Sequence, residues 1–216
     1  MEEFVRRTTR LAPAPFVPEI RLYQAGDLYD VWQQTERERG EADLPPPFWA
    51  VAWPGGQALA RHLLDNPGLV AGRRVVDFGS GSGLVAIAAA RSGAAAVTAV
   101  ETDPFALAAI ALNTTANEVA VTARTTVAGL AADIVVAGDV WYEKELARLV
   151  MDIADQAGAD GADVLAGDIG RTYFPHERFH RVANYRVPAS TALERSDVLR
   201  ASVWTTREAR REVSGG

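Results

Sequence analysis

A glycine-rich loop directly after a short apolar run is the feature that most constrains how this chain can fold. Residues 75–83 read VVDFGSGSG, and an Ala- and Leu-rich stretch follows them. Glycines at alternate positions let the backbone turn sharply and approach a ligand closely, because they have no Cβ. A helix that begins after Gly83 would offer free N–H groups to that ligand. The order strand, glycine loop, helix therefore predicts a ligand site inside an α/β fold.

The rest of the chain alternates β-rich runs with helical stretches, which is typical of a parallel sheet with helices on both faces. We expect strands that end near residue 77 and span residues 97–101, 122–127, 133–138 and 163–168. We expect helices at residues 85–92, 105–117 and 143–156, and a short one at 175–180. Two β-like stretches, 183–190 and 199–207, are expected to pair as an antiparallel edge hairpin with a charged, exposed linker at 191–198. The sequence thus predicts a Rossmann-like, doubly wound, mostly parallel sheet of seven strands.

The chain begins with a segment that we expect to act as a lid. Prolines among residues 13–18 favour an extended backbone there. A helix is expected at residues 27–39, and another at residues 54–64 after a break of three prolines. At 216 residues and 48% hydrophobic content the chain fits a single domain, with residues 1–47 as an N-terminal helical lid segment and residues 48–216 as the core.

Composition limits the partners of the chain. A formal net charge of -6 gives no broad basic face, so nucleic acid is not expected as a partner. The absence of cysteine excludes disulfides, thiolate nucleophiles and sulfur-ligated zinc. No apolar stretch resembles a signal or a membrane span, and we expect a cytoplasmic protein. Arginine dominates the basic residues and Lys144 is the only lysine, which indicates a GC-rich bacterial genome. The oligomeric state stays open.

The spacing of the glycines discriminates between cofactors. A dinucleotide fingerprint, GxGxxG, fails because Leu84 stands where the third glycine should be. Asp77, at the end of the strand, would repel a pyrophosphate but suits a ligand with positive charge, such as the ammonium and sulfonium of S-adenosylmethionine. Glu101 lies about 20 residues beyond the loop, where an acid accepts hydrogen bonds from ribose hydroxyls. The loop alone could be a tight turn, but strand, helix and acid together favour a nucleoside site.

These residues resemble the class I S-adenosylmethionine-dependent methyltransferases. The stretches FWAVAWPGGQALARHLLDNP, GDVWY, GDIGR and ALERSDVLRASVWTT are similar to the lysine methyltransferase family that modifies the electron transfer flavoprotein beta-subunit. This resemblance covers most of residues 48–206. In the wider seven-strand lysine methyltransferase group an acid and an aromatic residue, spaced (D/E)xx(Y/F), follow the fourth strand. Asp139 and Tyr142 occupy those positions here.

The resemblance implies a set of residues that bind S-adenosylmethionine and release S-adenosylhomocysteine. The methionine end is implied to contact the strand end and the loop, at Asp77, Gly79, Ser80, Gly81 and Gly83. Glu101 is implied to bind the ribose, the Gly138 backbone to lie beside it, and Trp53 to pack against the cofactor. No residue is assigned to the adenine, because residues 127–131 lack the acid or tryptophan that many relatives have there.

The acceptor chemistry points to Asp139 and Tyr142 as the catalytic residues. Methyl transfer from a sulfonium is an in-line displacement, so the protein has mainly to align and desolvate the partners. A lysine with a pKa of about 10.4 must also lose its proton before it attacks. We expect Asp139 to attract the ammonium and orient the amine, and Tyr142 and Trp141 to wall the channel. The alternative is that Asp139 caps the next helix and the aromatic residues lie in the core.

Three functions are compatible with these residues. A protein-lysine N-methyltransferase is favoured over a small-molecule or ribosomal-protein N-methyltransferase, and over a degenerate binding module that would have lost part of the loop or the acid–aromatic pair. The run His176 to His180 matches the zinc-protease pattern H-E-x-x-H, but its segment is short, no third ligand is evident, and we expect no metal. Trp32 and Trp49 are expected to be packing residues.

Overall fold

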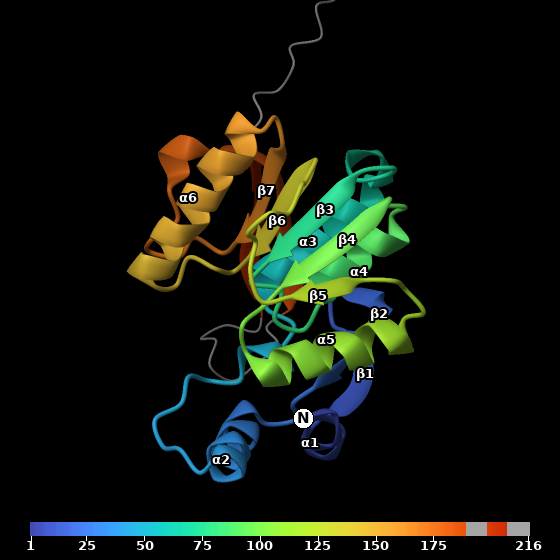
Figure 1. Ribbon diagram of the computed structural model, residues 1–216, viewed down its shortest axis with the longest axis vertical. Helices are drawn as coiled ribbons and strands as arrows, with labels where there is room; N and C mark the ends of the chain where they lie inside the picture. Colours follow the sequence, from blue (N-terminus) through green and yellow to red (C-terminus); the bar gives the residue numbers. More distant parts are fainter. Residues whose placement is uncertain (189–197, 207–216) are drawn as a thin grey trace, which may run out of the picture.

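A seven-stranded sheet with helices on both faces is the centre of the computed structural model, which describes residues 1–188 and 198–206 (Figure 1). The strand order is β5-β4-β3-β6-β7-β9-β8. The strands are β3 (Arg74–Phe78), β4 (Ala96–Val100), β5 (Thr122–Arg124), β6 (Ile134–Gly138), β7 (Asp163–Asp168), β8 (His180–Pro188) and β9 (Val198–Thr205). Strands β3 to β7 are parallel, and β9 runs antiparallel to both β7 and β8. The prediction of a doubly wound, mostly parallel sheet with an antiparallel hairpin is confirmed.

The central strands are almost entirely apolar because both of their faces are buried. Val75 and Val136 belong to the core that α3 (Pro54–Asp65) and α4 (Leu84–Arg91) cover. Their neighbours Val76 and Val135 belong to the core on the opposite face, which α6 (Lys144–Ala159) covers. The chain leaves β3 toward β4 and β5 on one side and returns to β6 on the other. The carboxyl ends of β3 and β6 therefore meet at the switch point where ligands bind in such sheets.

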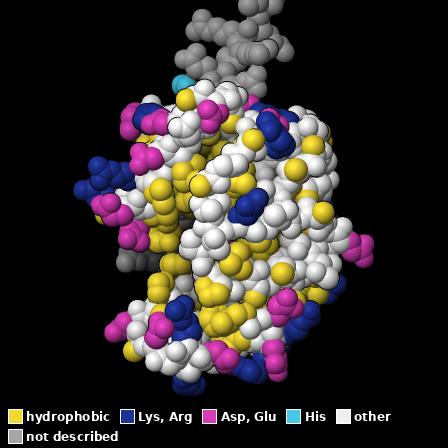
Figure 2. Space-filling model, viewed as in Figure 1, with side chains coloured by type: hydrophobic (Ala, Val, Ile, Leu, Met, Phe, Trp, Pro, Cys, Tyr) yellow, Lys and Arg dark blue, Asp and Glu magenta, His cyan; other side chains and the backbone are white. Residues whose placement is uncertain are grey.

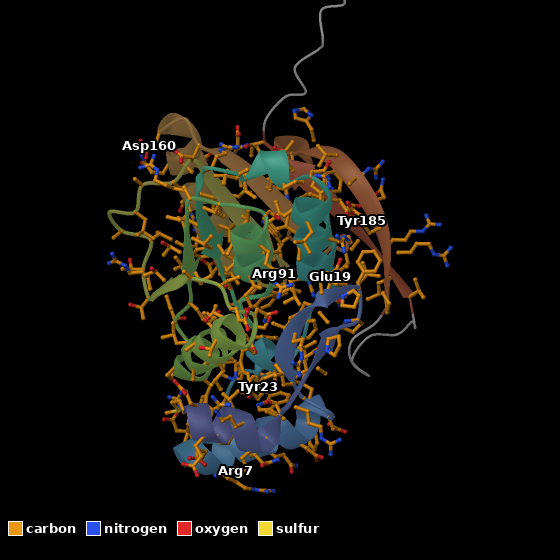
Figure 3. All side chains as sticks on the ribbon, turned by 90° about the vertical axis from the view of Figure 1, so that its right-hand side faces the viewer. Arg7, Glu19, Tyr23, Arg91, Asp160 and Tyr185 are labelled. Carbon is orange, nitrogen blue, oxygen red and sulfur yellow. The ribbon has the colours of Figure 1, made fainter. Side chains whose placement is uncertain are left out.

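The N-terminal segment packs beside α5 (Pro104–Ala116) rather than against the centre of the sheet. It consists of α1 (Glu2–Thr8), the hairpin strands β1 (Arg10–Ala14) and β2 (Val17–Gln24), and α2 (Leu28–Arg39), and the 3-10 turn η1 (Phe48–Ala50) follows it. The extended backbone was predicted, but its pairing as a hairpin and the helix α1 were not. Arg91 of α4 donates to the Glu19 carbonyl (2.7 Å), and both residues are labelled in Figure 3. That bond and the contacts of β2 with α5 fix the hairpin to the core.

Several element ends differ from the expectation. Strand β5, expected at residues 122–127, ends at Arg124. Residues 125–133 connect it to β6 without a helix. The expected helix at 175–180 is only a 3-10 turn, η3 (His176–Arg178), because β8 begins at His180. A second 3-10 turn, η2 (Pro67–Leu69), follows α3. Of the expected linker at 191–198, residues 191–197 lie outside the described residues and Val198 begins β9. Residues 189–190 and 207, at the ends of the two expected β-like stretches, also lie outside them. No helix in the described ranges is long and apolar enough to cross a membrane.

Candidate active site

A cavity of about 730 Å³ lies at the carboxyl ends of the central strands. Nine of the ten predicted site residues line it, namely Trp53, Asp77, Gly79, Ser80, Gly81, Glu101, Gly138, Asp139 and Tyr142. Apolar side chains of α6, among them Leu146 and Leu149, continue the lining away from the glycine loop. Figure 2 shows apolar side chains gathered in a furrow on this face of the molecule. Thr35 and Arg39 of α2 border the cavity from the N-terminal segment.

The glycine loop needs its glycines for backbone conformation and for space. Gly79, Gly81 and Gly83 have φ values of 64°, 52° and 82°, in the left-handed region that other residues avoid. A Cβ on Gly79 would lie 2.8 Å from a methyl carbon of Val140. Gly83 is the residue before α4 and does not line the cavity, so its part is to begin the helix.

Asp77 braces the glycine loop. It is 1% exposed, and one carboxylate oxygen accepts hydrogen bonds from the Ser80 hydroxyl (2.6 Å) and the Ala86 backbone N–H (3.0 Å). Burial raises the pKa of Asp77 to about 7, against the smaller lowering effect of these two bonds. The carboxyl group is therefore close to the midpoint of its titration at neutral pH, and a cation nearby would ionise it.

Glu101 connects the end of β4 to the glycine loop. One of its oxygens accepts from the backbone N–H of Gly81 (3.0 Å). The other accepts from the N–H groups of Thr102 (2.7 Å) and Asp103 (3.2 Å). Asp103 in turn caps α5 by accepting from the Phe105 N–H. The acid thus lies beside the loop as its spacing predicted, and its part in ribose binding stays a prediction.

Asp139 is a buried carboxylate held from two sides. It follows β6 with a φ of 58° and is 6% exposed. One oxygen accepts from the Gly56 N–H (2.7 Å) and the other from the Arg171 guanidinium (3.2 Å). Burial raises the pKa of Asp139 to about 6, against the lowering effects of Arg171 and Gly56. The next helix, α6, has Glu143 before its first residue and no side-chain cap, which excludes the capping alternative.

Four glycines bring the start of α3 against the strand ends. A Cβ on Gly55 would lie 2.5 Å from the Gly167 carbonyl oxygen, and a Cβ on Gly138 would lie 2.8 Å from the Gly56 Cα. Only backbone fits between these segments, which is why the Gly56 N–H can reach Asp139. The sequence signals for this contact are the pair of glycines after Pro54 and the AGD triplets that end both β6 and β7.

Three aromatic rings form one wall of the cavity. The ring of Phe48 lies 5.1 Å from that of Tyr142 and 5.9 Å from that of Trp53, centroid to centroid. The Trp53 indole N–H donates to the Phe48 carbonyl (2.8 Å), which fixes the turn. Tyr142 is 43% exposed, and partial burial raises the pKa of its hydroxyl, so the phenol is neutral at physiological pH. No role was predicted for Phe48 from the sequence.

Trp141 does not wall the channel, contrary to the expectation. It is fully buried and packs edge-on against Phe174 (4.9 Å) and Phe179 (6.1 Å). Trp49 is 1% exposed and stacks on Phe105 (6.4 Å), so the packing interpretation was right for it.

Arg171 is the main site residue that the sequence analysis missed. Its guanidinium pairs with Asp139, and the central carbon lies 6.0 Å from the centre of the Trp53 ring. It follows β7 in the GDIGR stretch, three residues after Asp168, so its place after a strand end was the available signal.

The H-E-x-x-H pattern does not form the zinc-protease helix. Its first residues make the 3-10 turn η3, and His180 already belongs to β8. The His176 ring packs against Phe174 (4.9 Å) and Trp204 (5.2 Å). Within the described part of the chain, no three His, Asp or Glu side chains are grouped to hold a metal ion.

The comparisons with known proteins point to one class of enzyme for this fold and site. Residues 59–172 match the family profile described as ribosomal protein L11 methyltransferase (PrmA). A solved structure from Pyrococcus horikoshii, described as a candidate RNA methyltransferase, aligns with a TM-score of 0.54 at 16% identity, over 79% of this chain and 90% of that one. A methyltransferase complexed with S-adenosylhomocysteine aligns with a TM-score of 0.50 at 15% identity, over 76% and 52%. The fold and site define a class I S-adenosylmethionine-dependent methyltransferase.

Sequence similarity identifies the family within this class. The chain is 36% identical over 215 residues to the electron transfer flavoprotein beta subunit lysine methyltransferase of Xenopus laevis, covering 94% of this chain and 85% of that protein. The chain belongs to the electron transfer flavoprotein beta subunit lysine methyltransferase family. The family and cofactor inferred from the sequence are therefore confirmed.

Proposed function

We propose that this chain transfers the methyl group of S-adenosylmethionine to a lysine side chain of the electron transfer flavoprotein beta-subunit. One observation carries the proposal: a buried carboxylate, Asp139, and an aromatic wall share one cavity with the glycine loop. Membership of the lysine methyltransferase family supports the choice of acceptor.

The residues present fit the cofactor. A volume of about 730 Å³ lies within the usual range for small-molecule pockets. Bound S-adenosylmethionine supplies an activated methyl group on a sulfonium. We assign the charged methionine end of the cofactor to Asp77 and the loop residues Gly79, Ser80 and Gly81. Gly83 ends the loop and begins α4. The carboxyl group of Asp77 faces the positive charge that suits it, since a cation lowers its pKa.

The remaining contacts follow from the cavity lining. We assign the ribose hydroxyls to Glu101, which would exchange its bonds to backbone N–H groups for bonds to the ligand. We assign the Gly138 backbone to a position beside the ribose and Trp53 to packing against the cofactor, since both residues line the cavity.

On the acceptor side, Asp139 and the aromatic wall receive the lysine. Asp139 attracts the ammonium, and the rings of Tyr142 and Phe48 exclude water and favour a cation over their faces. Asp139 has a pKa of about 6, whereas free lysine has one of about 10.4. Asp139 is therefore mostly ionised at physiological pH and can hold and orient the incoming ammonium. Asp139 orients the amine, and the proton passes to water.

In the transfer step, one bond to the methyl carbon forms as another breaks. The neutral lysine nitrogen forms a bond to the methyl carbon while the carbon–sulfur bond breaks. The electron pair of that bond remains on sulfur, and the product is S-adenosylhomocysteine. The methylated nitrogen is positively charged and stays paired with Asp139 until it loses a proton to solvent.

The N-terminal segment is proposed to act as the lid of this site. Thr35 and Arg39 of α2 and Leu44 in the following loop border the cavity, which supports this role. The division into lid and core stays a prediction, as do the cytoplasmic location, the bacterial origin and the absence of nucleic-acid and membrane partners.

A ribosomal protein is the second candidate acceptor, because residues 59–172 match the L11 methyltransferase profile. That match excludes Phe48 and Trp53 and therefore most of the aromatic wall. The lysine methyltransferase match covers 94% of the chain. The flavoprotein subunit is consequently the favoured acceptor.

A competition between the two acceptors tests the proposal. The purified chain is incubated with methyl-labelled S-adenosylmethionine and either the flavoprotein beta-subunit or ribosomal protein L11, and label is located by gel and peptide mass spectrometry. We expect label on a lysine of the beta-subunit. Label on L11 alone would contradict the proposal. A Lys144→Arg variant removes the only lysine of the enzyme and serves as the self-methylation control.

A further inference from the structure

Arg171 lies between two buried carboxylates at neighbouring strand ends. One of its terminal nitrogens is 3.2 Å from Asp139, after β6, and its Nε is 4.0 Å from Asp168, at the end of β7. The Arg171 side chain is 22% exposed, and the two carboxylates are 6% and 0% exposed. The guanidinium of Arg171 is thus within reach of either carboxylate and can form an ion pair with one of them at a time.

Its pairing with Asp168 is incomplete. Within the described residues, the Arg171 Nε and one oxygen of Asp168 are buried and have no hydrogen-bond partner. Their separation of 4.0 Å exceeds hydrogen-bond range, and buried groups without partners destabilise a structure. The other Asp168 oxygen accepts from the N–H groups of Gly170 (2.6 Å) and Arg171 (2.7 Å). Asp168 is therefore a fixed position toward which the guanidinium can move to satisfy both groups.

The position that Arg171 holds now is one that an ammonium would also favour. One Asp139 oxygen is fixed by the Gly56 N–H (2.7 Å), and the other faces Arg171. The guanidinium also lies over the Trp53 ring. A lysine ammonium binds the same two kinds of partner, a carboxylate and an aromatic face.

We propose that Arg171 is a positioning residue that pairs with Asp139 before the acceptor lysine binds and moves to Asp168 when the lysine enters. The inference rests on the proposed lysine methylation. The exchange makes and breaks no covalent bond. Asp139 faces a cation throughout, first Arg171 and then the lysine ammonium, and Asp168 gains the guanidinium when the lysine binds, so neither buried charge is left unpaired in the complex.

The pairing also sets the charge of Asp139. The charged groups that face it are Arg171, which lowers its pKa, and Asp168, which raises it, while the Gly56 N–H lowers it from α3. Burial is the largest influence and raises the pKa. Without Arg171 the pKa would rise further, and the incoming ammonium would meet a larger fraction of neutral acid at physiological pH.

The first experiment measures the titration of Asp139 without any substrate. Carboxyl carbons of aspartate are labelled with ¹³C and followed by NMR between pH 4 and 9 in the wild type, Arg171→Gln and Arg73→Gln. Arg73 is the matched control, since it is 26% exposed and pairs with Asp163 at 2.9 Å far from the cavity. We expect the Asp139 midpoint to move up by about one pH unit in Arg171→Gln only. An unchanged midpoint in that variant would overturn the inference.

The second experiment measures steady-state kinetics with the flavoprotein beta-subunit. Asp168→Asn keeps the bonds to Gly170 and Arg171 through its amide oxygen but removes the charge that receives the guanidinium. We expect the KM for the protein acceptor to rise about 10-fold, which corresponds to about 1.4 kcal/mol, with kcat and cofactor affinity within about 3-fold. A KM equal to that of the wild type would contradict the exchange.

Arg171→Lys provides a second variant if Arg171→Gln does not fold. It keeps the positive charge beside Asp139 but has no Nε–H for Asp168. We expect a wild-type Asp139 midpoint together with a raised KM, and a lowered KM would contradict the inference. Wild-type enzyme that labels no lysine would overturn the proposed function instead, while the NMR titration still tests the pairing.

Discussion

Asp139 adopts a backbone conformation that limits which residues can replace it. Its φ of 58° lies in the left-handed region, which asparagine and aspartate tolerate better than alanine. Asp139→Asn therefore isolates the charge, whereas Asp139→Ala adds backbone strain. We expect Asp139→Asn to lower kcat/KM for the protein acceptor by about 100-fold, because the amide no longer attracts the ammonium. Initial rates at saturating cofactor measure this.

Calorimetric titration with S-adenosylhomocysteine is the control for the same variant. The carboxylate faces Gly56 and Arg171 rather than the glycine loop, so product affinity should stay within about 3-fold of wild type. Turnover equal to that of the wild type would refute the assignment of Asp139 to the acceptor.

Substitution of two adjacent aromatic residues should affect different properties, stability for one and activity for the other. Trp141 is fully buried, so Trp141→Ala is expected to lower the free energy of unfolding by about 3–5 kcal/mol. Tyr142 is 43% exposed at the cavity, so Tyr142→Ala should cost about 1 kcal/mol or less while reducing kcat/KM. Urea denaturation and acceptor kinetics separate the two effects. Equal losses of stability would show that the boundary between core and cavity is misplaced.

At the scale of elements, the contact between α3 and the ends of β6 and β7 depends on two neighbouring glycines in different ways. A Cβ on Gly55 would lie 2.5 Å from the Gly167 carbonyl oxygen, so Gly55→Ala is expected to destabilise the fold by about 1–3 kcal/mol. A Cβ on Gly56 has its nearest neighbours at 3.9 Å. Gly56→Ala should be neutral or stabilising by up to about 1 kcal/mol. Thermal unfolding of both variants checks this, and the reverse order would contradict the packing.

Elements whose determinants are local were predicted from the sequence. The glycine loop depends on residues a few positions apart, and the acid at Glu101 was predicted from its spacing of about 20 residues from that loop. Which of the two adjacent rings, Trp141 or Tyr142, lines the cavity could not be predicted from the sequence. The left-handed turn at Asp139 sets the direction of both side chains.

Contacts between distant segments account for the remaining differences. Arg171 and Phe48 reach the site from β7 and from before α3, and only the folded sheet brings them together. The hairpin of β1 and β2 is likewise held against α5, where Asn113 accepts from the Tyr23 N–H (2.8 Å), and no local pattern encodes that contact.

For the molecule as a whole, Asp77 links stability and cofactor binding to pH. Its folded pKa of about 7 is above the ordinary value near 3.8, so the folded state binds the proton more tightly than the unfolded state. The stability that this contributes is complete below about pH 4 and is lost as the pH rises through about 7. The free energy of unfolding of the wild type relative to Asp77→Asn should therefore fall between pH 5 and pH 8, as measured by urea denaturation.

Cofactor affinity should follow the opposite trend. A positively charged ligand favours ionised Asp77, so S-adenosylmethionine is expected to bind more tightly at pH 8 than at pH 6, and Asp77→Asn should lose this dependence. A difference in stability that does not vary with pH would show that Asp77 is ionised throughout.

The glycines between α3 and the sheet also limit which substitutions such an enzyme can accept, in evolution or by design. Gly55, Gly138 and Gly167 each contact backbone with no room for a side chain, so a substitution at one is tolerated only if the segment opposite moves as well. Any such movement displaces the Gly56 N–H from Asp139. Transferring Asp139 together with its backbone partner at Gly56 into another methyltransferase would therefore require these glycines as well.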